Sequence, residues 1–458
     1  MSSSKEAGAR RTIVLFTRDL RVHDHPALAE AVESAEQVVP LFVLDRALLG
    51  RFGAPNRVAF LLGALRDLGS SLRERGGALV IRDGDVVDET LRVALEVDAG
   101  AVFLSEDSSA YAIARAQRLR RACGRQRIEV RGFPGVTAIA PGDVAPADRD
   151  HYLVFTAYWR QWQSAARRAV LDAPRRVRVP SGLRRGRLPS IAELAAGAVS
   201  PELPPGGESE GRRRLDRWIA GGLRDYGRLH DDLAADATSR LSPYLRFGCL
   251  SPLEVIERAR TTEGSEPFVR QLAWRDFYAQ LLDANPETRR QDLRPRGDRW
   301  RDDEAALEAW KDGRTGFPLV DAGMRQLLRE GWMHNRARLV AGSFLTKDLY
   351  LDWRLGAQHF FELLVDGDVA SNVGNWQWVA GTGADTRPNR VFNPTLQARR
   401  FDPDGEYIRR YVPALAEVGG AGIHEPWKLG ARRPAAYPEP ILDHAEAAAR
   451  FRRARRSS

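Results

Sequence analysis

Cysteine, histidine and lysine are scarce in this chain of 458 residues. The two cysteines, Cys123 and Cys249, lie far apart, which argues against a disulfide framework and against zinc-ligand spacing built on cysteine pairs. No apolar run approaches the roughly 18 residues of a membrane-spanning helix, and no secretory leader is recognisable at the N-terminus. We therefore expect a reduced, cytoplasmic protein without a membrane anchor or a metal site.

Basic residues outnumber acidic ones, 70 to 61. Lysine occurs only four times, so nearly all of the 70 basic residues are arginine, and the formal net charge is +9. This balance favours a polyanionic partner, although a solvated basic surface would give the same composition. With 43% hydrophobic residues the chain can build sizeable cores, and its length suggests two or three domains.

The first 135 residues predict an α/β domain. Five short apolar runs read as buried strands, TIVLFT, VVPLFVLD, ALVIRDG, AVFLSED and RIEVRGF, with helices expected near 26–34, 56–75, 86–97 and 109–123. This order predicts a doubly wound parallel sheet that binds ligands at the carboxyl ends of its strands, where Arg18, Asp19, Asp45 and Asp107 fall. Acids at these positions can equally cap the following helices. No glycine fingerprint follows the first strand, so we do not expect the usual dinucleotide binding by this sheet.

The remainder divides into a linker and a helical domain. Residues 136–210 are rich in proline, glycine and arginine and read as an interdomain linker without a core of its own. From 211 to 458 apolar residues recur at helical spacing, and all but two of the eleven tryptophans lie there, which predicts an all-α domain with tryptophan in its core. The final basic segment RFRRARRSS is expected to be a disordered tail.

The stretch 366–378, DGDVASNVGNWQW, combines acids, amides and indoles between apolar runs. At helical spacing Asp368, Asn372 and Trp376 share one face, and Asp366 precedes them. Carboxylates and amides enclosed in this way need partners. A capped helix whose acids bond nearby arginines is one explanation. A magnesium site is weaker, because no further carboxylate cluster follows at ligand spacing.

Six segments of the chain match segments of one known protein family, in the same order and at the same spacing. They are TSRLSPYLRFGCLSP, WRDFY, RTGFPLVDAGMRQL, GWMHNRARL, DGDVASNVGNWQW and FNPTLQARRFDPDGEYIRRY. In these the chain resembles the photolyase/cryptochrome family, and most of all the class I cyclobutane pyrimidine dimer (deoxyribodipyrimidine) photolyases of bacteria. The resemblance runs from FTRDLRVHDHPAL to HEPWK, nearly the whole chain. It implies an N-terminal antenna-binding domain and a helical domain that binds one reduced FAD and DNA.

The resemblance also implies site residues. Positions that match flavin contacts are Tyr226, Thr238, Ser239, Arg240, Leu241 and Ser242 around the phosphates and ribitol, and Asn335, Arg338, Asp366, Asp368 and Asn372 around the isoalloxazine. An ion pair between Arg338 and Asp366 is expected. Asn372 matches the residue that faces the reducible ring nitrogen, where a neutral amide is compatible with a reduced flavin anion.

The resemblance implies light-driven electron transfer to a lesion that is flipped out of UV-damaged DNA. Matching lesion or DNA contacts are Gln271, Trp274, Arg275, Asn335, Arg336, Leu339, Trp378 and Arg390, with Gln271, Asn335 and Asn372 assigned to catalysis. Trp376, Trp353 and Trp300 match a relay that carries electrons from the surface to oxidised flavin. Indole is easily oxidised, so three in sequence can serve as stepping stones.

Two positions depart from the pattern of the dimer-repairing enzymes. Gln271 stands where those enzymes usually carry Glu, and Leu339 where they usually carry Met. Gln also occurs there in enzymes that repair 6-4 photoproducts, but those enzymes have His at the places of Asn335 and Leu339 for proton transfer. Dimer repair is therefore expected ahead of 6-4 repair.

Other assignments remain open. Asp107, Tyr111 and Arg246 resemble binders of an 8-hydroxy-deazaflavin antenna more than binders of methenyltetrahydrofolate. Besides a repair enzyme, the alternatives are a blue-light signalling cryptochrome and a generic basic flavoprotein oxidoreductase. We expect a monomer, with DNA as its macromolecular partner and no protein partner.

Overall fold

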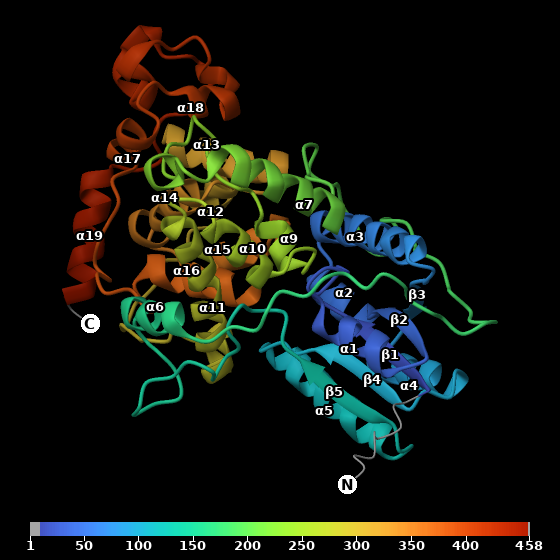
Figure 1. Ribbon diagram of the computed structural model, residues 1–458. Helices are drawn as coiled ribbons and strands as arrows, with labels where there is room; N and C mark the ends of the chain where they lie inside the picture. The colour runs from blue at the N-terminus through green and yellow to red at the C-terminus, as the bar shows by residue number, and fades with distance from the viewer. Residues whose placement is uncertain (1–9, 457–458) are drawn as a thin grey trace.

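A computed structural model describes residues 10–456 of the chain. Five parallel strands and their helices form one end of the molecule, and the helices from residue 208 onward form the other (Figure 1). Between them, a long stretch of chain with one helix crosses from the sheet to the helical body.

The sheet has the strand order β3-β2-β1-β4-β5, and every neighbouring pair is parallel. All five strands expected from the apolar runs are confirmed, and so are the four expected helices: β1 Arg11–Phe16, β2 Gln37–Leu44, β3 Val80–Asp83, β4 Ala101–Ser105, β5 Glu129–Phe133, α1 Pro26–Ser34, α3 Pro55–Glu74, α4 Val86–Glu96 and α5 Ala110–Gly124. The order reverses between β1 and β4, where doubly wound sheets form a crevice at the strand ends.

A short helix, α2 Arg46–Phe52, was not expected. Asp45 is its N-cap and accepts hydrogen bonds from the backbone N–H groups of Ala47 and Leu48. The alternative that an acid at a strand end caps the next helix is thus correct for Asp45.

The segment between the two ends contains α6 Phe155–Ser164. This helix packs on the helical body, and Trp162 is fully buried in a cluster of apolar side chains that also contains Phe16 of the sheet and Phe277 of α11 (Glu266–Ala284). The sheet and the helical body therefore share one core. Where the domain boundaries fall stays a prediction.

The helical body contains thirteen α-helices within the described residues: α7 Glu208–Arg217, α8 Tyr226–Leu229, α9 Ser242–Arg246, α10 Pro252–Arg260, α11 Glu266–Ala284, α12 Glu304–Lys311, α13 Pro318–Glu330, α14 Asn335–Ser343, α15 Trp353–Leu363, α16 Val369–Ala380, α17 Pro394–Phe401, α18 Glu406–Tyr411 and α19 His444–Arg456. Two short π-helices, Trp218–Gly222 and Phe344–Asp348, continue α7 and α14. Within 10–456 no helix is both long and apolar enough to cross a membrane.

Close backbone contact joins the two ends next to Arg18. Gly248, with φ +65°, follows α9, and a Cβ at this position would lie 1.9 Å from the carbonyl oxygen of Arg18. The backbone N–H of Leu20 donates to Phe247 (3.2 Å). Only glycine permits this approach without displacing the chain, so Gly248 helps to fix the end of β1 against the helical body.

The basic C-terminal segment is a helix, so the expectation of a disordered tail is wrong as far as Arg456. Ala447, Ala448 and Phe451 form a buried apolar stripe on α19, and Arg455 pairs with Asp298 (2.6 Å). The many arginines of this segment hid the stripe in the sequence, because they outnumber its three buried apolar residues. Ser457 and Ser458 lie outside the described residues.

Candidate functional site

The shared face of Asp368, Asn372 and Trp376 lies at the beginning of α16. Asp368 is the N-cap and accepts a hydrogen bond from the backbone N–H of Ser371 (2.9 Å). All three side chains line one cavity of about 80 Å³, which also contains four other residues matched to the flavin or the lesion: Asn335, Arg338, Leu339 and Asp366. The helix expected from the spacing is confirmed, and it places polar and aromatic groups at one concave site.

Asp366 is held by two elements of the helical body. Its Oδ2 accepts hydrogen bonds from Arg338 of α14 (2.8 Å) and from the Ser242 hydroxyl at the start of α9 (2.6 Å). The expected ion pair of Arg338 with Asp366 is confirmed. The other oxygen, Oδ1, is buried and has no hydrogen-bond partner among the described residues.

Asp368 connects the helical body to the sheet. Arg18, just after β1, donates to Asp368 (2.6 Å) and to Asp107 after β4 (3.2 Å). Burial alone would raise the pKa of Asp368, but the guanidinium groups of Arg18, Arg246 and Arg275 hold it well below its usual range. A capped helix whose acids bond arginines is therefore a correct description of these contacts, and it coexists with the cavity.

The residues matched to the flavin phosphates and ribitol differ in burial: Thr238, Ser239 and Arg240 are partly buried, Tyr226 and Leu241 are buried, and Ser242 is exposed. Arg240 has a positive φ of 49° and pairs with Asp236 (2.8 Å) and Glu330 (2.7 Å). Its guanidinium lies 4.4 Å from the centre of the Trp332 ring, and the Trp332 indole N–H donates to Ser242 (3.1 Å). The helix that follows Ser242 has only five residues, so the side chains of this stretch, rather than a helix dipole, would have to hold an anion.

The donor set fits a flavin nucleotide. Three buried polar atoms near these residues have no partner among the described residues: Thr238 Oγ1, His334 Nε2 and Asp366 Oδ1. Buried polar groups normally find partners, so these atoms are available to a polar ligand.

The three tryptophans matched to the relay differ in burial. Trp376 and Trp353 are buried, whereas Trp300 is partly buried. Trp376 packs so closely on α15, which Trp353 begins, that a Cβ at Gly356 would lie 2.2 Å from its ring. The Trp353 indole N–H donates to Asp292 (2.8 Å).

Trp310, which sequence reasoning did not single out, lies beside this relay. It is fully buried, and its ring centre is 6.1 Å from that of Trp376. Its indole N–H donates to the Ala341 carbonyl (3.0 Å). In the sequence, nothing but its being a tryptophan indicated that Trp310 could belong to the site.

The residues matched to the DNA lesion lie on several elements. Arg390 is exposed, and its guanidinium lies 5.1 Å from the ring centre of Trp378. Asn335 is exposed at the first turn of α14 and also lines the α16 cavity. Gln271 on α11 is exposed, and its amide reaches only the Pro267 carbonyl (3.5 Å).

Two other matched residues are engaged within the protein. Trp274 stacks on Phe155 with ring centres 3.7 Å apart, and no ring contact joins it to Trp378 in residues 10–456. Arg336 forms a two-pronged pair with Asp231 (2.5 and 3.1 Å) and is only partly exposed.

Arg275, which was matched to a DNA contact, is engaged within the protein in this structure. Its guanidinium donates to the Val136 carbonyl (2.7 Å) and lines a cavity between the sheet and the helical body. Burial lowers its pKa. Successive helical residues point about 100° apart, so Arg275 lines this cavity whereas its neighbour Trp274 stacks on Phe155.

The interdomain cavity has a volume of about 500 Å³ and opens at the carboxyl ends of β1, β2 and β4. Asp107 and Arg246, the two residues matched to the antenna, both line it, together with Tyr111. The Tyr111 hydroxyl bonds Asp45. Burial, followed by repulsion from Arg18, lowers the pKa of Arg246 to about 9, and its Nε donates to the Gly367 carbonyl (2.9 Å).

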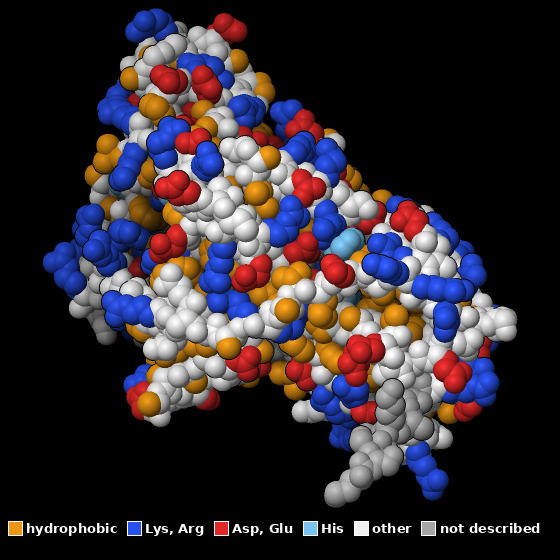
Figure 2. Space-filling view, viewed as in Figure 1, with side chains coloured by type: hydrophobic (Ala, Val, Ile, Leu, Met, Phe, Trp, Pro, Cys, Tyr) orange, Lys and Arg blue, Asp and Glu red, His pale blue; other side chains and the backbone are white. Residues whose placement is uncertain are grey.

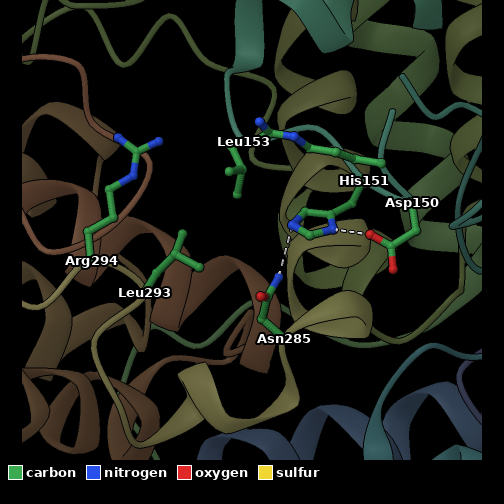
Figure 3. Close-up of a pocket in the computed structure, with 7 residues that line it drawn as sticks. Asp150, His151, Leu153, Asn285, Leu293 and Arg294 are labelled. Atoms are coloured by element: carbon green, nitrogen blue, oxygen red, sulfur yellow. Dashed lines mark hydrogen bonds and ion pairs between the residues drawn. The ribbon is translucent and has the colours of Figure 1, made fainter. Parts of the chain in front are cut away.

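A third depression, of about 540 Å³, lies at the C-terminal end of α11, and none of its residues was expected to form a site. His151 lies between Asp150 (2.6 Å) and Asn285 (3.3 Å), facing Leu293 and Arg294 across the opening (Figure 3). Within the described range, no group of three or more His, Cys, Asp or Glu residues is placed to hold a metal ion.

Comparisons with known proteins agree with this geometry. Residues 12–178 match the family model described as DNA photolyase, and residues 268–457 match the FAD binding domain of DNA photolyase. A deoxyribodipyrimidine photo-lyase of Streptomyces griseus is 53% identical over 450 residues, covering 97% of this chain and 98% of its own. A cryptochrome DASH of Gloeobacter violaceus is 34% identical over 96% of this chain and 94% of its own. The crystal structure of a bacterial class III photolyase from Agrobacterium tumefaciens superposes with a TM-score of 0.91 at 33% identity, covering 100% of this chain and 99% of the other.

Proposed function

The chain belongs to the photolyase/cryptochrome family, and from this premise we propose that it is a light-driven enzyme that splits cyclobutane pyrimidine dimers in UV-damaged DNA. The observation that carries the proposal is the position of Asn335. Its side chain is exposed to solvent, yet it lines the same cavity as Asn372 and Asp368. A lesion on its outer side and a flavin on its inner side would be separated by little more than one residue.

When bound, reduced FAD supplies an electron on illumination and takes it back after the dimer has opened. The protein's residues hold and orient the two partners. Asn372 donates its amide to the Ala357 carbonyl (2.9 Å), which orients a neutral group toward the cavity. The Arg338 pair neutralises Asp366, so that this acid does not repel an anionic ring.

Residues on the outer side would bind the lesion after base flipping of the kind that photolyases use. Trp378 and Trp274 offer aromatic faces, Leu339 an apolar contact, and Gln271 and Asn335 amides that can bond pyrimidine carbonyls. Arg390 and Arg336 would contact phosphates, which position the duplex.

Repair of 6-4 photoproducts needs a proton donor, and the proposed lesion site offers no histidine for this role. Asn335 and Leu339 occupy the two positions at which 6-4 repair enzymes carry histidine. The histidine next to them in the sequence, His334, is buried. It caps α14 through its Nδ1, and burial lowers its pKa to about 4. His334 is therefore neutral at physiological pH and cannot act as a general acid there.

The interdomain cavity supports an antenna with an ionisable group. Arg246 is partly buried without a carboxylate at ion-pair distance in residues 10–456, which is costly unless an anion approaches. An 8-hydroxy-deazaflavin, whose hydroxyl is acidic, suits this environment better than methenyltetrahydrofolate. We further propose that the protein acts as a cytoplasmic monomer.

The test is illumination of the reduced, flavin-loaded protein with two oligonucleotides, one bearing a cyclobutane dimer and one a 6-4 photoproduct. We expect repair of the dimer alone. Repair of the 6-4 substrate alone would overturn the lesion assignment. Repair of neither by flavin-loaded protein would favour a signalling cryptochrome. Reduction of nicotinamide or a quinone without any repair would favour an oxidoreductase.

Gln271 variants refine this test. Gln271→Glu should keep or raise dimer repair, whereas Gln271→Leu should weaken dimer binding by about 1–3 kcal/mol, since the lesion's carbonyls lose a hydrogen-bond donor. Gln358→Leu, a similar change at an exposed position of α15, is the control and should bind normally. Equal binding by Gln271→Leu would show that Gln271 does not touch the lesion.

A further inference from the structure

Tyr350 lies against the outermost tryptophan of the relay. The ring centres of Trp300 and Tyr350 are 5.2 Å apart. The Tyr350 carbonyl also accepts a hydrogen bond from the backbone N–H of Arg301 (2.9 Å), which ties the two segments together. Trp300 is partly buried and Tyr350 is buried. Electron transfer between aromatic rings in contact needs no intermediate group.

The Tyr350 hydroxyl has a base within reach. It donates to Asp298 Oδ1 (3.1 Å), and the other carboxylate oxygen is buried without a hydrogen-bond partner among the described residues. Asp298 also pairs with Arg455 of α19 (2.6 Å). Burial raises the pKa of Asp298, although Arg455 opposes this rise, and a higher pKa makes the carboxylate a better proton acceptor.

The backbone of Tyr350 adopts a conformation that bulky residues rarely take. Its φ is 57°, in the left-handed region. The Phe451 ring of α19 lies edge-on to Tyr350, with centres 6.0 Å apart. Surrounding contacts therefore hold this aromatic side chain in place at some cost in backbone energy, a pattern found at functional positions.

We propose that Tyr350 is a further electron donor in the relay, an inference that rests on the proposed function. After Trp300 has lost an electron toward photoexcited oxidised flavin, through Trp353 and Trp376, its indole radical cation takes one electron from Tyr350. The phenolic O–H bond breaks, and the proton passes to the Asp298 carboxylate. The products are a neutral Trp300, a neutral tyrosyl radical and a protonated Asp298.

Coupling to a proton explains why such a step is useful. A phenol that loses an electron becomes strongly acidic, so oxidation is easiest where a base already accepts its hydrogen bond. The reverse step must return the proton as well as the electron. The hole is therefore held longer than on an indole alone, which gives an external reductant time to act.

The experiment is transient absorption after a light flash on protein loaded with oxidised FAD. We expect the broad absorption of a tryptophan radical to give way to the sharp band of a neutral tyrosyl radical. This conversion should slow two-fold or more in D2O, because the transferred proton is exchangeable. Tyr350→Phe should abolish the tyrosyl band and shorten the life of the charge-separated state.

Matched variants separate this role from a structural one. Tyr407→Phe removes a buried hydroxyl that bonds Gln326 (2.8 Å) outside the relay, and it should leave both radical signals unchanged. Asp298→Asn, which retains a hydrogen-bond acceptor but is a poor base, should slow or suppress tyrosyl formation even if it lowers stability. A tyrosyl band that persists in Tyr350→Phe, or its absence from the unmodified protein while a tryptophan radical forms, would overturn the proposal.

Failure of the proposed function would look different. If no tryptophan radical forms in the unmodified protein, Tyr350 has no oxidant and the proposal is overturned together with the relay. If radicals form as described but neither lesion is repaired, the Tyr350 assignment stands and the repair assignment fails. Trp300→Phe should remove the tyrosyl band, because it removes the partner that oxidises Tyr350.

Discussion

Asp368 combines three structural roles in a single side chain. It caps α16, pairs with Arg18 of the sheet domain, and lines the cavity that we assign to the flavin. Its carboxylate is therefore placed by contacts from both ends of the molecule. Removing its charge should affect the site more than the helix, because asparagine is as good a cap as aspartate.

Asp368→Asn should yield folded protein with a reduced flavin content. Arg18 would keep its pair with Asp107 but lose the shorter contact to Asp368, and because this pair is partly exposed the loss should cost less than the ~3–5 kcal/mol of a fully buried pair. The ratio of flavin to protein absorbance and the unfolding midpoint measure the two effects. Asp85→Asn is the control, because Asp85 also caps a helix and pairs with an arginine (2.9 Å) in an exposed setting. Full flavin occupancy in Asp368→Asn would remove Asp368 from the site.

The pair of Arg18 with Asp368 should make the stability of the protein depend on pH, and the lowered pKa of Asp368 fixes the direction of this dependence. The pKa of Asp368 is lower in the folded protein than in the unfolded chain. Its contribution to stability is therefore complete above the unfolded value of about 4 and is lost as the pH falls through the folded value. The stability difference between the parent protein and Asp368→Asn should accordingly narrow in acid.

Local contacts at the site could be inferred from the sequence, whereas distant ones could not. The pair of Arg338 with Asp366 was expected from a resemblance, and the face shared by Asp368 and Asn372 follows from helical period. The contact between Arg18 and Asp368 joins residues 350 positions apart. No local pattern in the sequence indicates such a contact.

At the scale of elements, α15 and α16 carry the two buried tryptophans that were matched to the relay. Trp376 on α16 fits into the space left by Gly356 on α15, and the edge of its ring meets Phe360 (4.9 Å). Helix packing thus holds the innermost indole in a fixed orientation while keeping water from it. The neighbouring Trp310 has similar burial but no assigned role.

Trp376→Phe should stop photoreduction of oxidised flavin and spare dimer repair by chemically reduced enzyme. Phenylalanine is much harder to oxidise than tryptophan, whereas repair does not use the relay. Illumination followed by flavin absorbance measures the first effect, and an oligonucleotide assay the second. Trp310→Phe, a similar change 6.1 Å away, should retain photoreduction. Unchanged photoreduction in Trp376→Phe would mean that another route carries the electron.

The helix α19 shows how a charged composition can hide a structural element. Phe451 is fully buried beside Tyr350 and Lys347, yet arginines surround it in the sequence. Phe451→Ala should lower the free energy of unfolding by about 3–5 kcal/mol through loss of packing, as measured in urea. Leu396→Ala, at a side chain that is 58% exposed, should change it by less than about 0.5 kcal/mol. Equal stability of the two variants would mean that α19 is not docked in solution.

At the scale of the whole molecule, the fold was more predictable than its interfaces. Five buried strands separated by amphipathic helices leave few alternatives to a parallel doubly wound sheet. The core shared between the sheet and the helical body was not foreseen, because its aromatic members come from distant segments such as Phe60 and Phe247, which stack at 4.8 Å. Such packing depends on tertiary complementarity that periodicity does not encode.

Basic side chains are spread over the visible face of the molecule and gather over α19 near the C-terminus (Figure 2). With a net charge of +9, binding to DNA should weaken as salt rises, because each phosphate contact releases counterions. Arg390 is the exposed arginine on which we test phosphate binding, because it adjoins Trp378 and was matched to a phosphate contact.

Arg390→Gln should lower the slope of log affinity against log salt by about one unit, for damaged and undamaged duplexes alike. A phosphate contact carries no information about the lesion, so the ratio of the two affinities should stay nearly constant. Arg390→Lys should restore the slope, because it retains the charge without the planar guanidinium. Arg121→Gln, at an exposed position of α5 in the sheet domain, is the control and should leave the slope unchanged. A loss of affinity for damaged DNA alone would instead place Arg390 at the lesion, acting through its contact with Trp378.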